Sequence, residues 1–199
     1  MKKSIALLTL AVVGFAAELD RARQLVEERK FREAESELRA VVADQPDNAQ
    51  AHYYLGLALL GLNREAEAEA ALRRAIELKN DEAQFHLGLT RALIEQKRWD
   101  QARQSLNRAR ELDPNHKEIP YYEGLLKIAQ RDFKGALRDL ERAVERDPEN
   151  AYAHYYLGMA YNATQRPDKM IEHFDLFLKY APPDAPEIRK VQSVLKSVR

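Results

Sequence analysis

The sequence predicts an all-α protein made of five copies of a helix-turn-helix unit and closed by a C-terminal helix. Three observations lead to this fold class. The chain repeats itself with a period of 34 residues, the apolar residues in each period follow helical spacing in two runs, and prolines and glycines are few, eight and seven in 199 residues. A fixed period of this length is typical of stacked supersecondary units. Hydrophobic residues make up 45% and charged residues 32%, which is typical of a soluble, helix-rich protein.

The first sixteen residues differ from everything that follows. Lys2 and Lys3 form a basic start, an apolar run covers residues 5–13, and Ala16 ends a stretch of small residues that a signal peptidase could read. The run is shorter than the roughly 20 residues of a membrane-spanning helix. We therefore predict a signal peptide over residues 1–16, cleaved after Ala16 or, as the alternative, after Ala17. An uncleaved anchor or a buried helix are the other interpretations of this segment.

A signal peptide would place the protein in the bacterial periplasm or outside the cell. The chain has no cysteine, which excludes a lipid anchor on a cysteine, disulfides and thiolate metal sites. Its formal charge is 32 minus 32, or zero, and removal of two signal-peptide lysines would leave 30 minus 32, or −2. Such a balance predicts no nucleic-acid partner and no membrane insertion after signal removal.

Five units fit the period, and they cover residues 15–48, 49–82, 83–116, 117–150 and 151–184. Four prolines and one asparagine close the units in one register, at Pro46, Asn80, Pro114, Pro148 and Pro182. Alanine and leucine recur ahead of the first four closing residues, as Ala34 and Leu38, Ala68 and Leu72, Ala102 and Leu106, and Ala136 and Leu140. A proline ends one helix and the polar residues beside it can cap the next, so each unit is predicted to be two antiparallel helices.

Small residues recur where two helices must approach closely. Gly56, Gly124 and Gly158 share one place in the first helix of their units, where Ala22 and Thr90 are the equivalents. Glycine inside a helix costs roughly 0.5–1 kcal/mol relative to alanine, so its recurrence indicates a packing requirement.

Several linked motifs resemble the tetratricopeptide repeat family. The first helix carries Tyr54-Leu55-Gly56 and Tyr156-Leu157-Gly158, the second begins with Trp99-Asp100-Gln101-Ala102 or Phe133-Lys134-Gly135-Ala136, and Leu112-Asp113-Pro114-Asn115 matches the closing turn. The resemblance covers essentially the whole chain after residue 16. It implies a right-handed α-solenoid with a concave groove that holds peptides or partner proteins.

The departures from the repeat pattern fall mainly at the ends. Arg21 stands where the other units place a leucine such as Leu55, and the last unit has Met170 and Phe177 in place of small residues. Terminal repeats have only one neighbour, so atypical residues are expected there. Residues 185–199 carry an apolar stripe and are predicted to form a capping helix, with Ile188, Val191, Leu195 and Val198 on the stripe.

The resemblance also indicates which residues line the groove, because the first helix of each unit faces inward in this family. Seven of the nine tyrosines fall on inward places. Tyrosine is common in binding surfaces, since it combines a large contact area with a hydroxyl group. The predicted partner-binding residues are Tyr53, Tyr54, Leu57, Arg91, Tyr121, Tyr122, Leu125, Tyr152, Tyr155, Tyr156, Met159 and Asn162. The alternative is that some rings only pack between helices and that Arg91 pairs with Glu95.

No catalytic, metal or cofactor site is predicted. His52, His86 and His154 share one repeat position, but no second ligand follows at i+4, so packing within each unit is favoured over a metal ladder. Phosphate-binding glycine loops and activated serines are absent.

The predicted function is a non-catalytic protein-interaction scaffold. The alternatives are a self-assembling module that dimerises through Met170, Phe174, Phe177 and the capping stripe, and an accessory subunit of an envelope enzyme or assembly complex. A homo-oligomer is possible but is not favoured.

Overall fold

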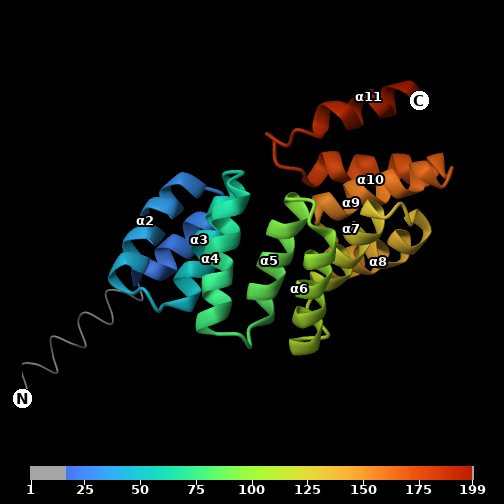
Figure 1. Cartoon of the computed structure of the whole chain (residues 1–199). Helices are drawn as coiled ribbons and strands as arrows, with labels where there is room; N and C mark the ends of the chain where they lie inside the picture. The colour runs from blue at the N-terminus through green and yellow to red at the C-terminus, as the bar shows by residue number, and fades with distance from the viewer. Residues whose placement is uncertain (1–16, 199) are drawn as a thin grey trace, which may run out of the picture. The chain divides into compact units, whose positions relative to one another are not determined.

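The computed structural model describes residues 17–198, and within that range all regular secondary structure is helical. The chain divides into two compact units, one ending at Leu112 and the other beginning at Asp113. Each unit is a layered stack of antiparallel helices (Figure 1). The predicted signal peptide, residues 1–16, lies outside the described residues.

The first unit begins with a helical segment over residues 17–27. It continues with α2 (Phe31–Asp44), α3 (Ala49–Gly61), α4 (Glu65–Leu78), α5 (Ala83–Glu95) and α6 (Trp99–Leu112). Helices α3 and α4 form one close pair, and α5 and α6 form another. Between pairs, α2 packs on α3 and α4 packs on α5.

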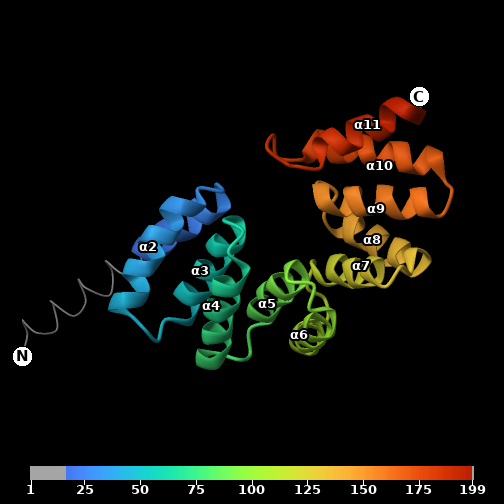
Figure 2. The ribbon, with the colours of Figure 1, turned by 45° about the horizontal axis from the view of Figure 1, so that its top comes forward.

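The second unit contains α7 (Ile119–Ala129), α8 (Phe133–Arg146), α9 (Ala151–Ala163), α10 (Pro167–Tyr180) and α11 (Ile188–Val198). Helices α7 and α8 form one close pair and α9 and α10 the other, while α8 packs on α9. Figure 2 shows α9 and α10 side by side, with α11 following α10. The helix pairs and the final helix confirm the predicted all-α fold class.

The helix boundaries follow the 34-residue period because the same local signals recur. The second helix of each pair begins at Phe31, Glu65, Trp99, Phe133 and Pro167, each 34 residues after the last. At the N-termini of α3, α8 and α9, the side-chain oxygen of the capping residue accepts a hydrogen bond from the backbone N–H three residues later. These caps are Asn48 to Ala51 N at 3.0 Å, Asp132 to Gly135 N at 2.9 Å and Asn150 to Ala153 N at 2.9 Å.

The turn inside each pair repeats as closely as the helices do. One residue in every turn has a left-handed backbone, with φ between 56° and 63°, and none of them is glycine: Arg29, Asn63, Lys97, Arg131 and Gln165. Two backbone bonds close each turn, as in Lys97 N to Ile94 O at 2.8 Å and Arg98 N to Leu93 O at 2.8 Å. This pair of bonds is the Schellman motif, which ends a helix and reverses the chain.

The cores of both units are built from the residues that repeat. Each of the recurring alanines and leucines is at most 3% exposed. A Cβ at Gly56 would lie 2.5 Å from Leu72 Cγ, and one at Gly124 would lie 2.5 Å from Leu140 Cγ. Since real Cβ contacts are longer than this, the glycines are required for the first and second helix to approach, as the sequence predicts.

Helix α11 covers the end of the second unit. Val191 and Leu195 are 1% and 3% exposed, and the helix packs on α10. This confirms the predicted capping helix. Met170, Phe174 and Phe177, which the sequence offered for dimerisation, are at most 4% exposed inside the unit and so do not form an open surface.

Candidate functional site: a tyrosine cluster and a hollow between helices

Five tyrosines of α7 and α9 belong to one group of contacting rings in the second unit, which Tyr152 joins through Phe177. This tyrosine cluster consists of Tyr121, Tyr122, Tyr152, Tyr155 and Tyr156. The ring centroids of Tyr121 and Tyr156 are 6.3 Å apart, so the group bridges the two helices. Neighbouring rings on each helix meet nearly edge to face, at 5.2 Å for both the Tyr121–Tyr122 and the Tyr155–Tyr156 pairs. Such tilted aromatic contacts stabilise rings beyond their buried area.

Part of this cluster belongs to the core rather than to the surface. Tyr122 and Tyr155 are each 7% exposed and Leu125 is 8% exposed. Tyr155 packs on Phe177, with ring centroids 5.3 Å apart. These three predicted groove residues therefore support the surface from below, because their side chains are enclosed within the unit.

The remaining predicted residues of the second unit reach solvent. Tyr121, Tyr152, Tyr156 and Met159 are half-buried, and Asn162 is exposed. The hydroxyl of Tyr152 donates to Glu187 Oε2 at 3.3 Å, so the segment before α11 borders this face. The accessible part of the cluster is aromatic and adjoins a methionine, whose side chain adapts to different partner shapes.

In the first unit the predicted groove residues lie on α3 and α5. Tyr53 packs between helices, with its ring centroid 5.0 Å from that of Phe85 and 5.1 Å from that of Tyr54. Burial raises the pKa of Tyr54. Leu57 is half-buried and Arg91 is exposed, and no Arg91–Glu95 ion pair is found among the described residues. Tyr53 thus illustrates the alternative in which a repeat tyrosine serves packing.

The histidines at the shared repeat position each bind a backbone carbonyl of the preceding turn. The ring Nε2 lies 2.9 Å from Pro46 O in His52, 3.3 Å from Asn80 O in His86 and 3.0 Å from Pro148 O in His154. In each case the carbonyl lies in the turn that closes the preceding repeat, so the ring fastens that turn to the following helix, which supports the packing interpretation. No cluster of three or more metal-ligating side chains occurs in residues 17–198.

A buried histidine pair, which the sequence did not indicate, joins α9 to α10. Nδ1 of His154 lies 3.0 Å from Nδ1 of His173, and the two residues are 4% and 9% exposed. One ring must donate and the other accept, so at least one of them is neutral. Burial, together with the neighbouring His154, lowers the pKa of His173 to about 4.

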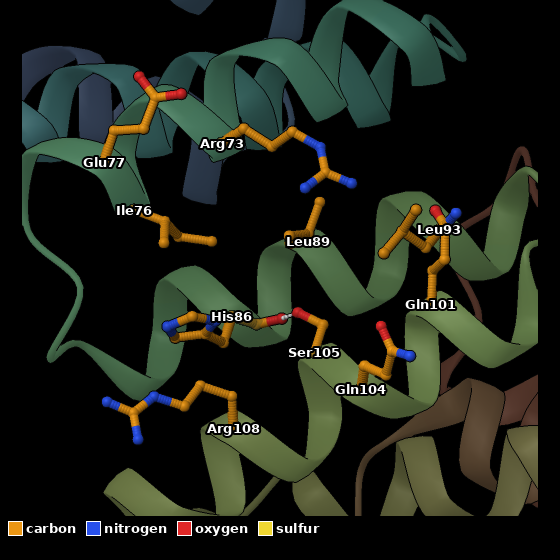
Figure 3. A pocket seen from close by; sticks show the side chains of 10 residues that line it. All are labelled: Arg73, Ile76, Glu77, His86, Leu89, Leu93, Gln101, Gln104, Ser105 and Arg108. Carbon is orange, nitrogen blue, oxygen red and sulfur yellow. Dashed lines mark hydrogen bonds between the residues drawn. The ribbon is translucent and has the colours of Figure 1, made fainter.

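The first unit also contains an open hollow of about 550 Å³ between α4, α5 and α6. Figure 3 shows His86, Leu89 and Ser105 between the guanidinium groups of Arg73 and Arg108. The Ser105 hydroxyl donates to the His86 carbonyl at 2.9 Å. The hollow is lined by Arg73, Ile76, Glu77, His86, Leu89, Leu93, Gln101, Gln104, Ser105 and Arg108. The sequence predictions do not include it, because a gap between packed helices leaves no residue pattern in the sequence.

No helix in the described part of the chain combines the length and the apolar character needed to cross a bilayer. The helices are 11 to 14 residues long, as expected for a stack of short pairs.

Solved structures of tetratricopeptide proteins resemble this chain in fold. A thermophilic TPR protein of Thermus thermophilus superposes with a TM-score of 0.75 at 17% identity, covering 92% of this chain and 97% of that one. PilF of Pseudomonas aeruginosa gives 0.68 at 17% identity, with 92% and 87% covered. YrrB, described as a TPR protein with an unusual peptide-binding site, gives 0.57 at 20% identity, with 90% of both chains covered.

A comparison with curated proteins finds no match. Two family models do match, and both are described as tetratricopeptide repeat. One covers residues 19–83 and 121–186, and the other covers residues 66–126. These ranges include every helix pair described above. The chain therefore belongs to the tetratricopeptide repeat family.

Proposed function

We propose that the protein is a non-catalytic scaffold that binds a peptide or protein partner through the first helices of its repeats. The observation that carries the proposal is the tyrosine cluster of α7 and α9, in which buried rings hold half-exposed rings in place. Rings that are already ordered lose little conformational entropy on binding, so they suit a contact surface.

The chemistry of the cluster favours an apolar or aromatic partner segment. Tyr121, Tyr152, Tyr156 and Met159 present ring faces and a thioether, and each tyrosine adds a hydroxyl for orientation. An extended peptide or one face of an amphipathic helix would fit such a row of side chains. The first unit, taken by itself, offers half-buried Leu57 as an apolar contact and exposed Arg91 as a cation.

Neither catalysis nor a cofactor contributes to this proposal. Several aspartates and glutamates pair with arginines, for example Glu69 with Arg73 along α4 at 2.8 Å and Asp47, in the turn before α3, with Arg74 at 2.9 Å. Such pairs are typical of solvated repeat surfaces. Binding, without chemistry, accounts for the arrangement.

The experiment selects peptides from a random displayed library on the immobilised protein and then measures their affinity by calorimetry. We expect selected peptides to be rich in aromatic and aliphatic residues. The double variant Tyr121→Ala/Tyr156→Ala should weaken their binding at least about tenfold, because two central aromatic contacts are lost.

The matched control is Tyr180→Ala, which removes a tyrosine from α10 instead of α7 or α9. This variant should bind the selected peptides as the unchanged protein does. Equal affinity of the peptides for the double variant and the unchanged protein would exclude the tyrosine cluster as the binding site.

We also propose that the protein is exported, because its N-terminal residues have the three-part pattern of a signal peptide. N-terminal sequencing of protein from whole cells should find Ala17 as the first residue. Recovery of the chain with Met1 in place would contradict cleavage.

A further inference from the structure

We infer that the hollow between α4, α5 and α6 is a second binding site, which takes an aromatic side chain of a partner peptide together with an adjacent carboxylate. This site is separate from the proposed tyrosine surface and does not depend on it. Within the two units the repeats provide three equivalent places, and in the second unit a side chain of the protein fills the place.

In the second unit the equivalent place lies between α8, α9 and α10, and a tyrosine fills it. Tyr161 stands 68 residues, or two periods, after Leu93, and it is 3% exposed. Its ring stacks on His173, with centroids 5.3 Å apart and planes 7° apart, and the guanidinium carbon of Arg166 lies 4.9 Å from the ring centroid. The phenol is thus enclosed by the protein.

The hydroxyl of Tyr161 has a polar partner at the edge of this place. It donates to Glu141, which stands two periods after Arg73. Burial, with the hydrogen bond to Glu141, raises the pKa of Tyr161 to about 12. The fold therefore accommodates a phenol here when a charged residue on the preceding second helix faces its polar end.

At the first equivalent place, between α2, α3 and α4, a half-exposed ion pair links α2 to α4 instead. Arg39 Nη2 donates to Glu67 Oε2 at 3.1 Å. One period later, these residues correspond to Arg73 and Gln101. Because glutamine is uncharged, Arg73 cannot form the same ion pair with the following second helix.

The place between α4, α5 and α6 has neither an enclosed tyrosine nor such an ion pair. Leu93 stands where the second unit has Tyr161, and Ser105 stands where it has His173, so two rings are missing from the same position. The floor is apolar and buried, with Leu89 at 6% and Leu93 at 1% exposure. A ring of phenol size is the group that the fold already holds in this setting.

The rim indicates the charge of the ligand. Arg73 and Arg108 lie on opposite sides of the hollow, against a single lining carboxylate, Glu77 (Figure 3). Arg73 uses Nε and Nη2 for Glu69, and Arg108 uses Nη1 for Glu111. A guanidinium group has five N–H donors, so each arginine keeps donors for a ligand carboxylate. In the second unit the corresponding residues are Glu141 and Leu176, which suit a neutral phenol instead.

The test uses three acetylated, amidated tetrapeptides: Gly-Tyr-Glu-Gly, Gly-Leu-Glu-Gly and Gly-Tyr-Gln-Gly. Binding is followed through the backbone amide resonances of His86, Leu93 and Ser105 by NMR. We expect the first peptide to shift these resonances with a Kd on the order of 1 mM, as is typical of ligands of this size. The leucine and glutamine peptides should bind at least about threefold more weakly, because each lacks one of the two recognised groups.

Two sets of variants locate the site. Leu93→Tyr/Ser105→His introduces the two rings that the second unit has at these positions. The new rings should fill the hollow, so the peptide should no longer shift the resonances. Arg73→Gln/Arg108→Gln changes only exposed side chains, so the fold is kept, and it should remove the preference for the glutamate peptide over the glutamine peptide. Tyr121→Ala, in the tyrosine cluster, should leave the binding unchanged, which separates this site from the proposed function.

The inference fails if the three resonances do not move at about 10 mM peptide, ten times the expected Kd. It also fails if the leucine peptide binds as well as the tyrosine peptide. Retained glutamate preference in the arginine variant would equally overturn it.

Discussion

At the scale of single residues, one place in the second helix carries a different polar group in most repeats. Glu37, Ser105, Asp139 and His173 are separated by multiples of 34 residues, and each bonds to the first helix of its own pair. Glu37 pairs with Arg21 at 3.1 Å, Ser105 donates to the His86 carbonyl, Asp139 pairs with Lys127, and His173 bonds to His154. The unusual Arg21 in the first repeat is therefore matched by a carboxylate.

The histidine pair makes the stability of the second unit depend on pH. His173 has a pKa of about 4 in the folded protein, whereas an unfolded histidine has an ordinary value near 6.5. Below pH ~6.5 the unfolded chain binds a proton that the folded chain does not, so the free energy of unfolding falls as the pH drops toward 4. The loss is at most about 1.4 kcal/mol per pH unit for one proton.

Replacing His173 by glutamine should remove this part of the pH dependence. Urea unfolding of His173→Gln and of the unchanged protein, measured from pH 7 to 4, should give curves that converge at low pH. His116→Gln, which changes a half-exposed histidine of the same unit, is the control and should keep the original slope. Parallel curves for His173→Gln would show that His173 does not bind a proton differently in the two states.

At the scale of elements, the turn inside each pair tolerates a strained backbone. Five residues other than glycine occupy the left-handed region, which costs L-residues roughly 1 kcal/mol, less for asparagine. The two Schellman bonds and the packing of the helix pair hold them there. Helix formation in this protein is thus decided by pair packing as much as by local preference.

Lys97→Gly should stabilise the protein, because glycine adopts the φ of 58° without steric cost. We expect a gain of about 0.5 kcal/mol in the free energy of unfolding, after the added entropy of an unfolded glycine is subtracted. Chemical denaturation measures the change. Asn63→Gly is the matched control, and its gain should be smaller, since asparagine already tolerates this conformation. A destabilised Lys97→Gly would mean that the lysine side chain contributes contacts at the turn.

At the scale of the whole molecule, a stack of repeats requires a cover on its terminal helix pair. In the second unit this cover is α11, which packs on α10 through Val191 and Leu195. Without it, the apolar face of α10 would meet water.

Val191→Asp/Leu195→Asp should detach α11 from the unit. Burying two unpaired carboxylates is unfavourable, so we expect at least about 3 kcal/mol loss of packing and a lower Tm. Light scattering should then show association of the exposed α10 faces. Val198→Asp is the control on the same helix, where the side chain is 47% exposed, and should change stability by less than about 0.5 kcal/mol. A double variant that stays monomeric with unchanged Tm would rule out a capping role.

The 34-residue period by itself determined the helix pairs, their boundaries and the glycines at close contacts, because these features depend on short-range spacing that recurs along the chain. The period also pointed to the tyrosine-rich first helices. The period could not distinguish half-exposed Tyr121 from buried Tyr122, because the two tyrosines are adjacent in the sequence. Only the packing between helices decides which of the two rings is covered.

Only the tertiary structure revealed the hollow, the histidine pair and the strained turns. The hollow and the histidine pair depend on side chains that different helices bring together, and the turn angles depend on the packing of each helix pair. Leu93 and Ser105 look like ordinary repeat residues until Tyr161 and His173 are seen to stack in the equivalent place. The hollow is the space that the side chains of α4, α5 and α6 leave unfilled, so it can be recognised only when these helices are packed together.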